Sequence, residues 1–391
     1  MSSDFGLVHH LWNSGAEPGT MLDRALGEAR LDHLTVPVVT GPIEKFRLSP
    51  VHPPHTFVTE GGWHFPIDRR CYTGGPVKPR PARWVGKQDV LGKLGEYAGS
   101  RSVRLVFRVD LRAVTSLLEH EPHLRPRNAW GDENVAAGAC VLNPDLRELL
   151  RGTLADLTRY QPAGFQLVEW MPDLAIDRGA ARQFSWSPVL RQLLDVCFCP
   201  ACRQAATVAG VDPDQAARSL RVHAEQMIAD PEGYDGVGKV NEDRVLQAYL
   251  DARRRDSLTW LERLAESHGE RRWYMLTDHR LRSDPGGKVA TAFANLPPPC
   301  FVPVFRSLKS PLGDIRLEED FLDPVTGRRL ESFGLVLPLW HPFVRQAGEL
   351  VRVVSAAAQA GIAPIDFDGL EAAPGEAVDR LRQAVRFARR G

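Results

Sequence analysis

The sequence predicts a (β/α)8 barrel, also called a TIM barrel, that forms one domain over residues 1–391. The first observation is that eight nearly continuous apolar runs recur along the chain, as in strands that are buried on both faces. The second is that amphipathic helical patterns lie between most of these runs. The third is that the first run is followed by "NSGAEPG", which is not the glycine-rich phosphate turn that a doubly wound sheet commonly has at this point.

The eight runs give the expected strands in chain order. They begin at Phe5, His33, Ser102, Gly164, Arg271, Cys300, Phe333 and Gly361. Helical patterns are clearest over residues 20–30, 143–160 and 342–360. The pair Asn143-Pro144 fits a helix N-cap that is followed by proline in the first turn.

Two connections are too long for simple crossovers between parallel strands. They span residues 41–84 after strand two and residues 171–269 after strand four. Both follow the carboxyl end of a strand, which is the face where barrel enzymes build their sites. We expect the first insertion, which contains "GGWHFP", to form a lid over this face, and the second to be helical and to carry the sequence "CFCPACR".

Composition and charge exclude several classes of partner. Lys plus Arg and Asp plus Glu are balanced at 49 each, so no charge excess favours nucleic acid or an anionic membrane. No run approaches 18 uninterrupted apolar residues, and the N-terminus lacks the pattern of a secretory signal. We therefore expect a cytoplasmic protein with no nucleic-acid or membrane partner.

The cysteines indicate a metal site. Of six cysteines, three lie in the Cys-x-Cys-x-x-Cys arrangement of Cys197, Cys199 and Cys202. Tetrahedral Zn²⁺ requires a fourth ligand, for which Cys140 is the best candidate, while Cys71 and Cys300 are the other possibilities. Four thiolates leave no position for water, so the Zn²⁺ would be structural. The alternatives are a redox pair in "CPAC" and three unrelated packed thiols.

The same region carries a resemblance to a known family. The order of "ACVLNPDLRELL", a strand ending in glutamate and then "CFCPACR" is similar to that in the β-galactosidases of glycoside hydrolase family 42. In that family the glutamate is the acid/base and the cysteine loop completes a structural zinc site. The chain resembles more closely still some bacterial glycoside-hydrolase-like or α-amylase-like barrel proteins, which share "CFCPACR" and a segment like "RNAWGD". The specific match covers roughly residues 127–211.

Glycoside hydrolysis generally uses two carboxylates across the scissile bond. Glu169 ends the fourth strand and matches the acid/base position of the family; the alternative is a glutamate that pairs with an arginine at the barrel rim. The sequence departs from the family pattern, since Val168 precedes Glu169 and the seventh strand lacks a carboxylate. Asp278, at the end of the fifth strand, is the best candidate for the second carboxylate. Weaker candidates are Asp110, Asp366 and Asp368.

Aromatic and hydrogen-bonding side chains follow most of the other strands, as suits a sugar whose C–H faces stack on rings and whose hydroxyls need polar partners. Each of them could instead be a packing residue. The candidates for substrate binding are His10, Trp12, Asn13, Trp63, Arg108, His279, Arg306, Trp340 and His341.

These residues together predict a carbohydrate-active enzyme that acts on a glycosidic linkage of a small glycoside, with Glu169 as general acid/base. One alternative is a glycosidase-like enzyme that performs elimination or isomerisation on a sugar-bearing metabolite. The other is a non-catalytic barrel that binds a sugar or a partner protein. Related barrels often associate through such insertions, so the sequence leaves open whether the chain is a homo-oligomer.

Overall fold

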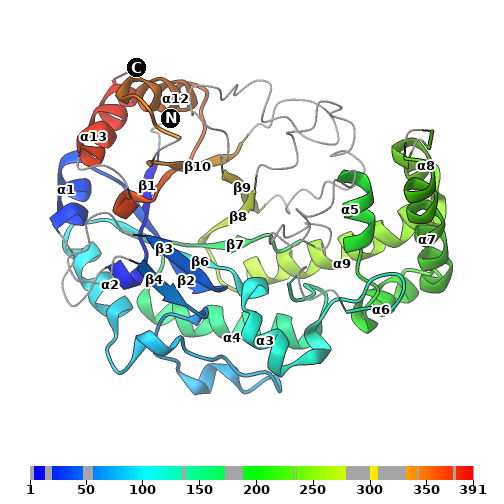
Figure 1. Cartoon of the computed structure of the whole chain (residues 1–391). Helices are drawn as coiled ribbons and strands as arrows, with labels where there is room; N and C mark the ends of the chain where they lie inside the picture. The colour runs from blue at the N-terminus through cyan, green and yellow to red at the C-terminus, as the bar shows by residue number, and fades with distance from the viewer. Residues whose placement is uncertain are drawn as a thin grey trace.

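The chain folds into a closed barrel of eight parallel strands, as the sequence predicted (Figure 1). The computed structural model describes residues 4–13, 20–46, 56–133, 138–171, 188–231, 233–234, 236–278, 300–306, 332–340, 343–372 and 376–390. The barrel strands are β1 (Phe5–Val8), β2 (His33–Thr40), β6 (Arg104–Val109), β7 (Gly164–Val168), β8 (Arg272–Asp278), β9 (Phe301–Arg306), β10 (Gly334–Pro338) and β11 (Ile365–Asp368). Strand β1 pairs in parallel with both β2 and β11, which closes the barrel.

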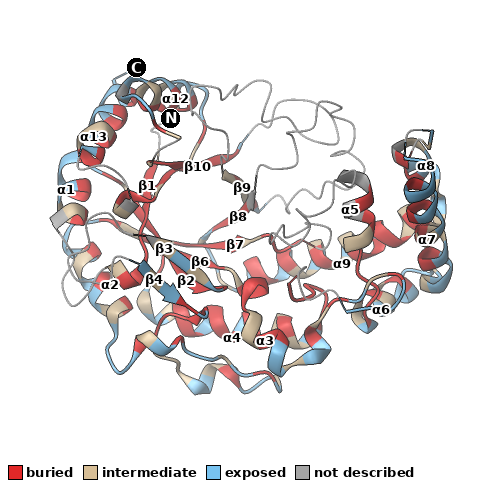
Figure 2. Ribbon diagram, in the orientation of Figure 1, coloured by how far each residue is buried: buried red, intermediate tan, exposed pale blue. Residues whose placement is uncertain are grey.

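Helices cover the outside of the barrel with their apolar faces turned inward (Figure 2). They are α1 (Thr20–Ala29), α2 (Val90–Ser100), α4 (Pro144–Leu157), α9 (Arg244–Glu266), α12 (Ala347–Gln359) and α13 (Ala377–Ala388). The predicted cap of α4 is confirmed, since the Asn143 side chain accepts hydrogen bonds from the amides of Asp145 and Leu146 and Pro144 opens the helix. The described helices include none with the length and apolar character of a membrane span.

Alternate residues of each strand point to opposite sides of the barrel wall. One set packs between the strands and the helices in the main core. The other set forms a separate apolar cluster inside the barrel, made of Val8, Val106, Tyr274, Leu276, Val304 and Val336. The barrel is therefore filled through its middle, and polar groups that point inward lie at its two ends.

The insertion after β2 contains the hairpin of β3 (Ile43–Phe46) and β4 (Thr56–Thr59), followed by β5 (Gly62–Trp63), which pairs antiparallel with the end of β2. A glycine is required at position 61, where φ is +84° and a Cβ would lie 2.5 Å from the carbonyl carbon of Gly41. The 3-10 turns η2 (Arg69–Tyr72) and η3 (Arg83–Val85) complete the described part of this insertion.

The insertion after β7 is helical and lies to one side of the barrel, drawn in green in Figure 1. It contains α5 (Pro188–Asp195), α6 (Pro200–Val208), α7 (Pro213–Ala229) and α8 (Gly236–Glu242), and α9 returns the chain to the barrel. Between β6 and α4 lie the short helix α3 (Thr115–His120) and the turns η4 (Leu111–Ala113) and η5 (Pro122–Leu124). Further 3-10 turns are η1 (Leu11–Asn13), η7 (Thr158–Tyr160) and η11 (Leu370–Ala372).

Candidate functional site

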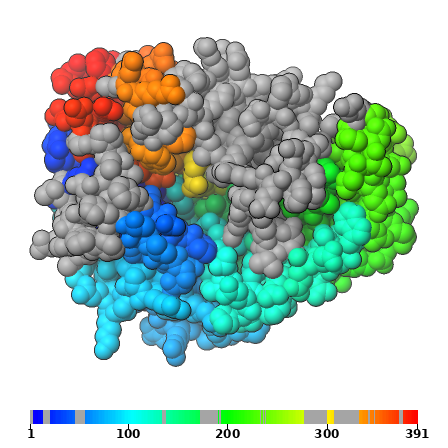
Figure 3. All heavy atoms as spheres, in the orientation of Figure 1, coloured from blue at the N-terminus to red at the C-terminus, as the bar shows by residue number. Residues whose placement is uncertain are grey.

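The barrel mouth is the region formed by the last residues of the eight strands and the residues directly after them. The β3–β4 hairpin reaches across one side of it, because Lys45 of β3 pairs with Asp368 at the end of β11 (Nζ–Oδ1 3.7 Å) and with Glu371 in η11. In the space-filling view this face is hollowed near its centre, where atoms of β9 are visible (Figure 3). The hairpin therefore forms part of the wall of the mouth.

An aromatic cluster lines the mouth beside the hairpin. Trp12, in the turn after β1, stacks on His10 at 4.5 Å between ring centroids and on Phe57 of β4 at 4.8 Å. Trp84 meets Trp12 edge to face at 6.2 Å. His10 and Trp12 were predicted from the sequence, whereas Phe57 and Trp84 were not, because they lie in an insertion that no strand pattern places at the mouth.

His64 joins this cluster as a neutral hydrogen-bonded ring. The Thr40 hydroxyl donates to the carbonyl of Gly41 (2.9 Å) and so accepts from Nε2 of His64 (2.7 Å). Nδ1 then accepts a hydrogen bond from the Trp84 indole (3.0 Å). Burial lowers the pKa of His64 to about 4, in agreement with a ring that is uncharged at neutral pH.

Trp63, which was expected to bind substrate, has a different place. It is fully buried, and its Nε1 donates to Oγ1 of Thr153 on helix α4 at 3.1 Å. Successive residues of an extended segment point to opposite sides, so His64 faces the mouth and Trp63 faces the outer helices. The sequence motif "GGWHFP" thus supplies the site with its histidine, and the structure places its tryptophan in the core.

Buried basic groups lie around the inner side of the mouth. Arg108, near the end of β6, is buried, and its Nε donates to Oε1 of Gln166 on β7. Burial lowers the pKa of Arg108 to about 10, and the positive charge of Arg306 on β9 adds to the effect. Burial likewise lowers the pKa of His9 to about 4 and that of His10 well below its usual value, so both rings are neutral at pH 7.

Glu169 follows β7 directly and has a strained backbone. Its φ is +49°, a left-handed conformation that is uncommon for residues other than glycine, and its side chain is buried. The amide of Glu169 donates to the carbonyl of Leu276 on β8 (2.9 Å), and its own carbonyl accepts from Nη1 of Arg112. The main chain at Glu169 is therefore held from the neighbouring strand and from a buried arginine.

The other predicted residues are only partly described. Asp278 is the last residue of β8 and is the register partner of Arg306, the last residue of β9. Trp340 is half-buried after β10 and meets Phe343 edge to face at 5.6 Å, and Asn13 is half-buried in η1. His279 and His341 lie outside the described residues. The roles of Glu169 and Asp278 as a carboxylate pair stay a prediction.

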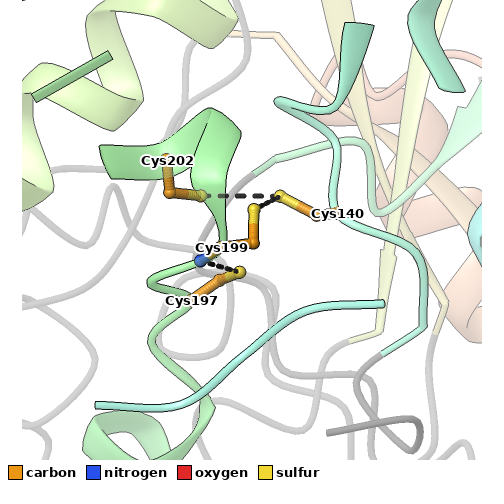
Figure 4. A group of neighbouring side chains, drawn as sticks. All are labelled: Cys140, Cys197, Cys199 and Cys202. Carbon is orange, nitrogen blue, oxygen red and sulfur yellow. Dashed lines mark hydrogen bonds between the residues drawn. The ribbon is translucent and has the colours of Figure 1, made fainter. Parts of the chain in front are cut away.

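Away from the mouth, Cys140, Cys197, Cys199 and Cys202 form a cluster that we call the cysteine centre (Figure 4). All four are buried, and their sulfurs lie within 4.8 Å of one another. Cys140 precedes α4, Cys197 and Cys199 lie between α5 and α6, and Cys202 is in α6. Cys71 and Cys300, the other candidates for the fourth ligand, are not part of the cluster.

The sulfurs of the cysteine centre are spaced as the ligands of one metal ion would be. The sulfur of Cys140 lies 3.5 Å from those of Cys199 and Cys202. Sulfurs bound at about 2.3 Å to a tetrahedral zinc are about 3.8 Å apart. The structure thus brings the three cysteines of "CFCPACR" together with Cys140, and the metal itself stays a prediction.

The surroundings of the cysteine centre favour a negative charge on Cys140, whereas the pKa values of the other three thiols are raised, mainly by burial for Cys197 and Cys202 and by the hydrogen bond to Cys140 for Cys199. Hydrogen bonds from the thiols of Cys197, Cys199 and Cys202 lower the pKa of Cys140, and the completely buried Arg253 adds to this effect. The main chain at Cys197 is held as well, since the Tyr249 hydroxyl donates a hydrogen bond to the carbonyl of Cys197 (2.7 Å). A tetrathiolate metal site carries net negative charge, which a buried arginine offsets.

A chain of hydrogen bonds joins the cysteine centre to Glu169. Ala139, the neighbour of Cys140, exchanges two hydrogen bonds with Arg112: its amide donates to the Arg112 carbonyl, and its carbonyl accepts from Nε, both at 3.1 Å. Nη1 of the same guanidinium donates to the carbonyls of Glu169 and Met171. Arg112 was not predicted from the sequence, because nothing in the pattern around it marks a residue that bridges two segments.

The closed strand order defines this chain as a (β/α)8 barrel protein. A β-galactosidase from the psychrophilic Marinomonas ef1 is similar at a TM-score of 0.48 and 10% identity, over 98% of this chain and 59% of that one. The α-L-fucosidase isoenzyme 2 from Paenibacillus thiaminolyticus is similar at a TM-score of 0.45 and 12% identity, over 100% of this chain and 49% of that one. The chitobiase of Flavobacterium johnsoniae is similar at a TM-score of 0.44 and 11% identity, over 99% of this chain and 47% of that one.

The chain spans about half the length of these solved structures. Likeness at this level carries no conclusion about activity, and the barrel assignment rests on the strand pairing itself. No protein-family model matches the sequence, and no curated protein matches it.

Proposed function

We propose that this protein is a carbohydrate-active enzyme that acts on a glycosidic linkage of a small glycoside, with Glu169 as the general acid/base. The observation that carries the proposal is the backbone of Glu169, which is left-handed at the carboxyl end of a barrel strand. Such strain costs about 1–3 kcal/mol and clusters at functional sites. The hydrogen bonds from Arg112 and to β8 hold this conformation in place.

The mouth supports a sugar as the ligand. Rings of Trp12, Phe57 and Trp84 lie beside polar groups, the combination that sugar faces and hydroxyls require. Among the described residues 10–13, directly after β1, three buried polar atoms have no hydrogen-bond partner: Nδ1 of His10, Nε1 of Trp12 and Oδ1 of Asn13. Since buried polar atoms are generally satisfied, substrate hydroxyls are the partners that we propose for them.

The experiment replaces the carboxyl group of Glu169 and measures the chemical step. In Glu169→Gln, kcat on unactivated alkyl glycosides, whose leaving oxygen needs a proton, should fall about 10²-fold to 10⁴-fold, the usual contribution of a general acid/base. Sugar binding and the unfolding temperature should stay close to those of the wild type. Glu148→Gln on the outer helix α4 is the matched control and should retain full activity.

Wild-type turnover in Glu169→Gln would contradict the assignment. Mass spectrometry of the products identifies the reaction, because hydrolysis adds one water to the substrate and isomerisation leaves its mass unchanged. Asp278→Asn tests the second carboxylate in the same assay, and a loss similar to that of Glu169→Gln is expected if both carboxylates act on the linkage.

We further propose that the cysteine centre binds one structural Zn²⁺ through its four thiolates. Support comes from the buried cluster, the 3.5 Å sulfur separations and the buried Arg253. Because thiolates would fill the whole tetrahedral shell, the metal would have no position for a reactive water. Metal analysis of the purified chain should give about one zinc per chain. A metal-free protein in which Cys199 and Cys202 cycle between thiols and a disulfide would overturn this proposal.

A further inference from the structure

Arg108 is a buried cation whose guanidinium makes few hydrogen bonds. Its side chain is 4% exposed, and its one hydrogen bond within the described part of the chain runs from Nε to Gln166. Nη2 is buried there without an acceptor, and no described carboxylate lies within ion-pair distance of the guanidinium. Burying an unpaired charge costs several kcal/mol, so an arginine in this position indicates a missing anion.

Two other arginines show what complete pairing looks like in this molecule. Arg112 is equally buried, but its guanidinium donates to the carbonyls of Ala139, Glu169 and Met171. Arg104 lies four residues before Arg108 on the same strand, and its Nη2 donates to Asp4 at 2.8 Å. Arg108 therefore differs from the equally buried Arg112 in what surrounds its terminal nitrogens. It differs from Arg104, whose side chain is 39% exposed, in being buried without a carboxylate partner.

The carboxylates that act on the charge of Arg108 already have other partners. Asp366 accepts hydrogen bonds from His33 (2.7 Å) and from Thr35 (2.9 Å). Asp368 lies 3.7 Å from the ammonium of Lys45. Asp110 also influences the pKa of Arg108, and its side chain accepts a hydrogen bond from the amide of Ala113 (3.2 Å). The guanidinium of Arg306 acts on Arg108 in the opposite direction to the carboxylates. A single negative charge would offset the buried charge of Arg108, while a dianion would be repelled more strongly by the nearby aspartates.

We propose that Arg108 binds a carboxylate carried by the substrate, so that the glycoside is an acidic one of the uronic-acid class. This inference rests on the proposed function, since it names the substrate of the same mouth. With Nε bound to Gln166, the two terminal nitrogens of Arg108 remain as a fork, and such a fork binds both oxygens of a carboxylate. The aromatic cluster would hold the sugar ring beside it.

The test measures binding to the wild-type protein by calorimetry, with free monosaccharides that contain no linkage to cleave. Each acidic sugar is compared with its neutral partner: glucuronic acid with glucose, and galacturonic acid with galactose. In at least one pair the acid should bind about 10-fold to 100-fold more tightly, as expected for charge-assisted hydrogen bonds. Equal binding within both pairs would overturn the inference, as would tighter binding of inorganic phosphate than of either acid.

Variants separate recognition from a structural role. Arg108→Gln should bind the acidic and the neutral sugar equally, and Arg108→Lys should restore part of the preference. Arg104→Gln is the matched control on the same strand and should keep the full preference. Without ligand, the unfolding temperature of Arg108→Gln should not fall, because the variant removes an unpaired buried charge. A lower unfolding temperature together with a retained preference for the acid would assign Arg108 a structural role.

The outcomes also separate this inference from the proposed function. If neutral glycosides are cleaved with the same kcat/KM as acidic ones, the enzyme assignment is kept and the proposed role of Arg108 is rejected. If uronic acids bind through Arg108 but no glycosidic linkage is cleaved, the carboxylate site stands and the enzymatic assignment falls.

Discussion

Polar groups at the amino end of the barrel interior are hydrogen-bonded to one another, whereas several at the carboxyl end have no partner among the described residues. At the amino end, His33 is bonded on one side to Asp366 (2.7 Å) and on the other to Asp4 (2.9 Å), and Arg104 also pairs with Asp4. Gly6 makes room for this network, since a side chain there would overlap the ring of His33. The amino end is thus a set of buried charges that satisfy one another.

At the carboxyl end, several buried atoms have no partner among the described residues. They include Nδ1 of His10, Nε1 of Trp12, Oδ1 of Asn13 and Nη2 of Arg108. In (β/α)8 barrels the amino end serves stability and the carboxyl end holds the active site. The contrast in this protein agrees with that rule: the cluster at the amino end completes its own hydrogen bonds, and the mouth that we propose as a binding site leaves some for a ligand.

The largest expected effect is on stability, and it tests whether the cysteine centre is a stabilising cluster like the one at the amino end. Cys140→Ser should lose the zinc, and its free energy of unfolding should fall by more than about 4 kcal/mol, because metal loss is among the most destabilising single changes. Zinc content and denaturant unfolding measure this. Cys71→Ser, outside the cluster, is the control and should change neither. Full zinc content in Cys140→Ser would place the metal elsewhere.

The amino end should show its stabilising role in the pH dependence of unfolding. Burial alone would lower the pKa of His33, but Asp366 and Asp4 outweigh burial and raise it to about 9. A raised histidine pKa stabilises the fold fully below about pH 6.5, and this contribution is lost as the pH rises towards 9. The shift corresponds to about 3 kcal/mol.

Denaturant unfolding between pH 6 and pH 9 checks this expectation. The stability of the wild type should fall over that interval, and the stability of His33→Gln should depend much less on pH. Parallel stability curves for the two proteins would show that His33 is not charged in the folded state.

The smallest expected effect concerns Arg112, which joins the cysteine centre to the mouth. Arg112→Met should lower kcat about 10-fold while KM stays nearly constant, since the guanidinium positions the main chain of Glu169 and not the substrate. Arg112→Lys should restore part of kcat, because an ammonium can still donate to carbonyls. Zinc content should stay at that of the wild type. Equal losses in kcat and zinc would indicate general disruption of the insertion.

Much of the architecture could be predicted because its determinants are local. All eight barrel strands lie where apolar runs were read, and α4 begins at its Asn143-Pro144 signal. The spacing of Cys197, Cys199 and Cys202 predicted a cluster, and Cys140 completes it. In each case a few neighbouring residues carry the information, through burial on both faces of a strand, a helix cap or the reach of three thiols.

The sequence by itself determined the closed parallel barrel, the positions of its two insertions and the types of residue available at the strand ends. Tertiary structure alone decided that His64 and not Trp63 faces the mouth, that Phe57 stacks on Trp12, and that Arg112 rather than Arg108 is saturated by carbonyls. The physical reason is that these outcomes depend on which distant segments meet. A side chain becomes a core residue, a brace or a binding group according to the hydrogen-bond partners that the folded chain brings to it.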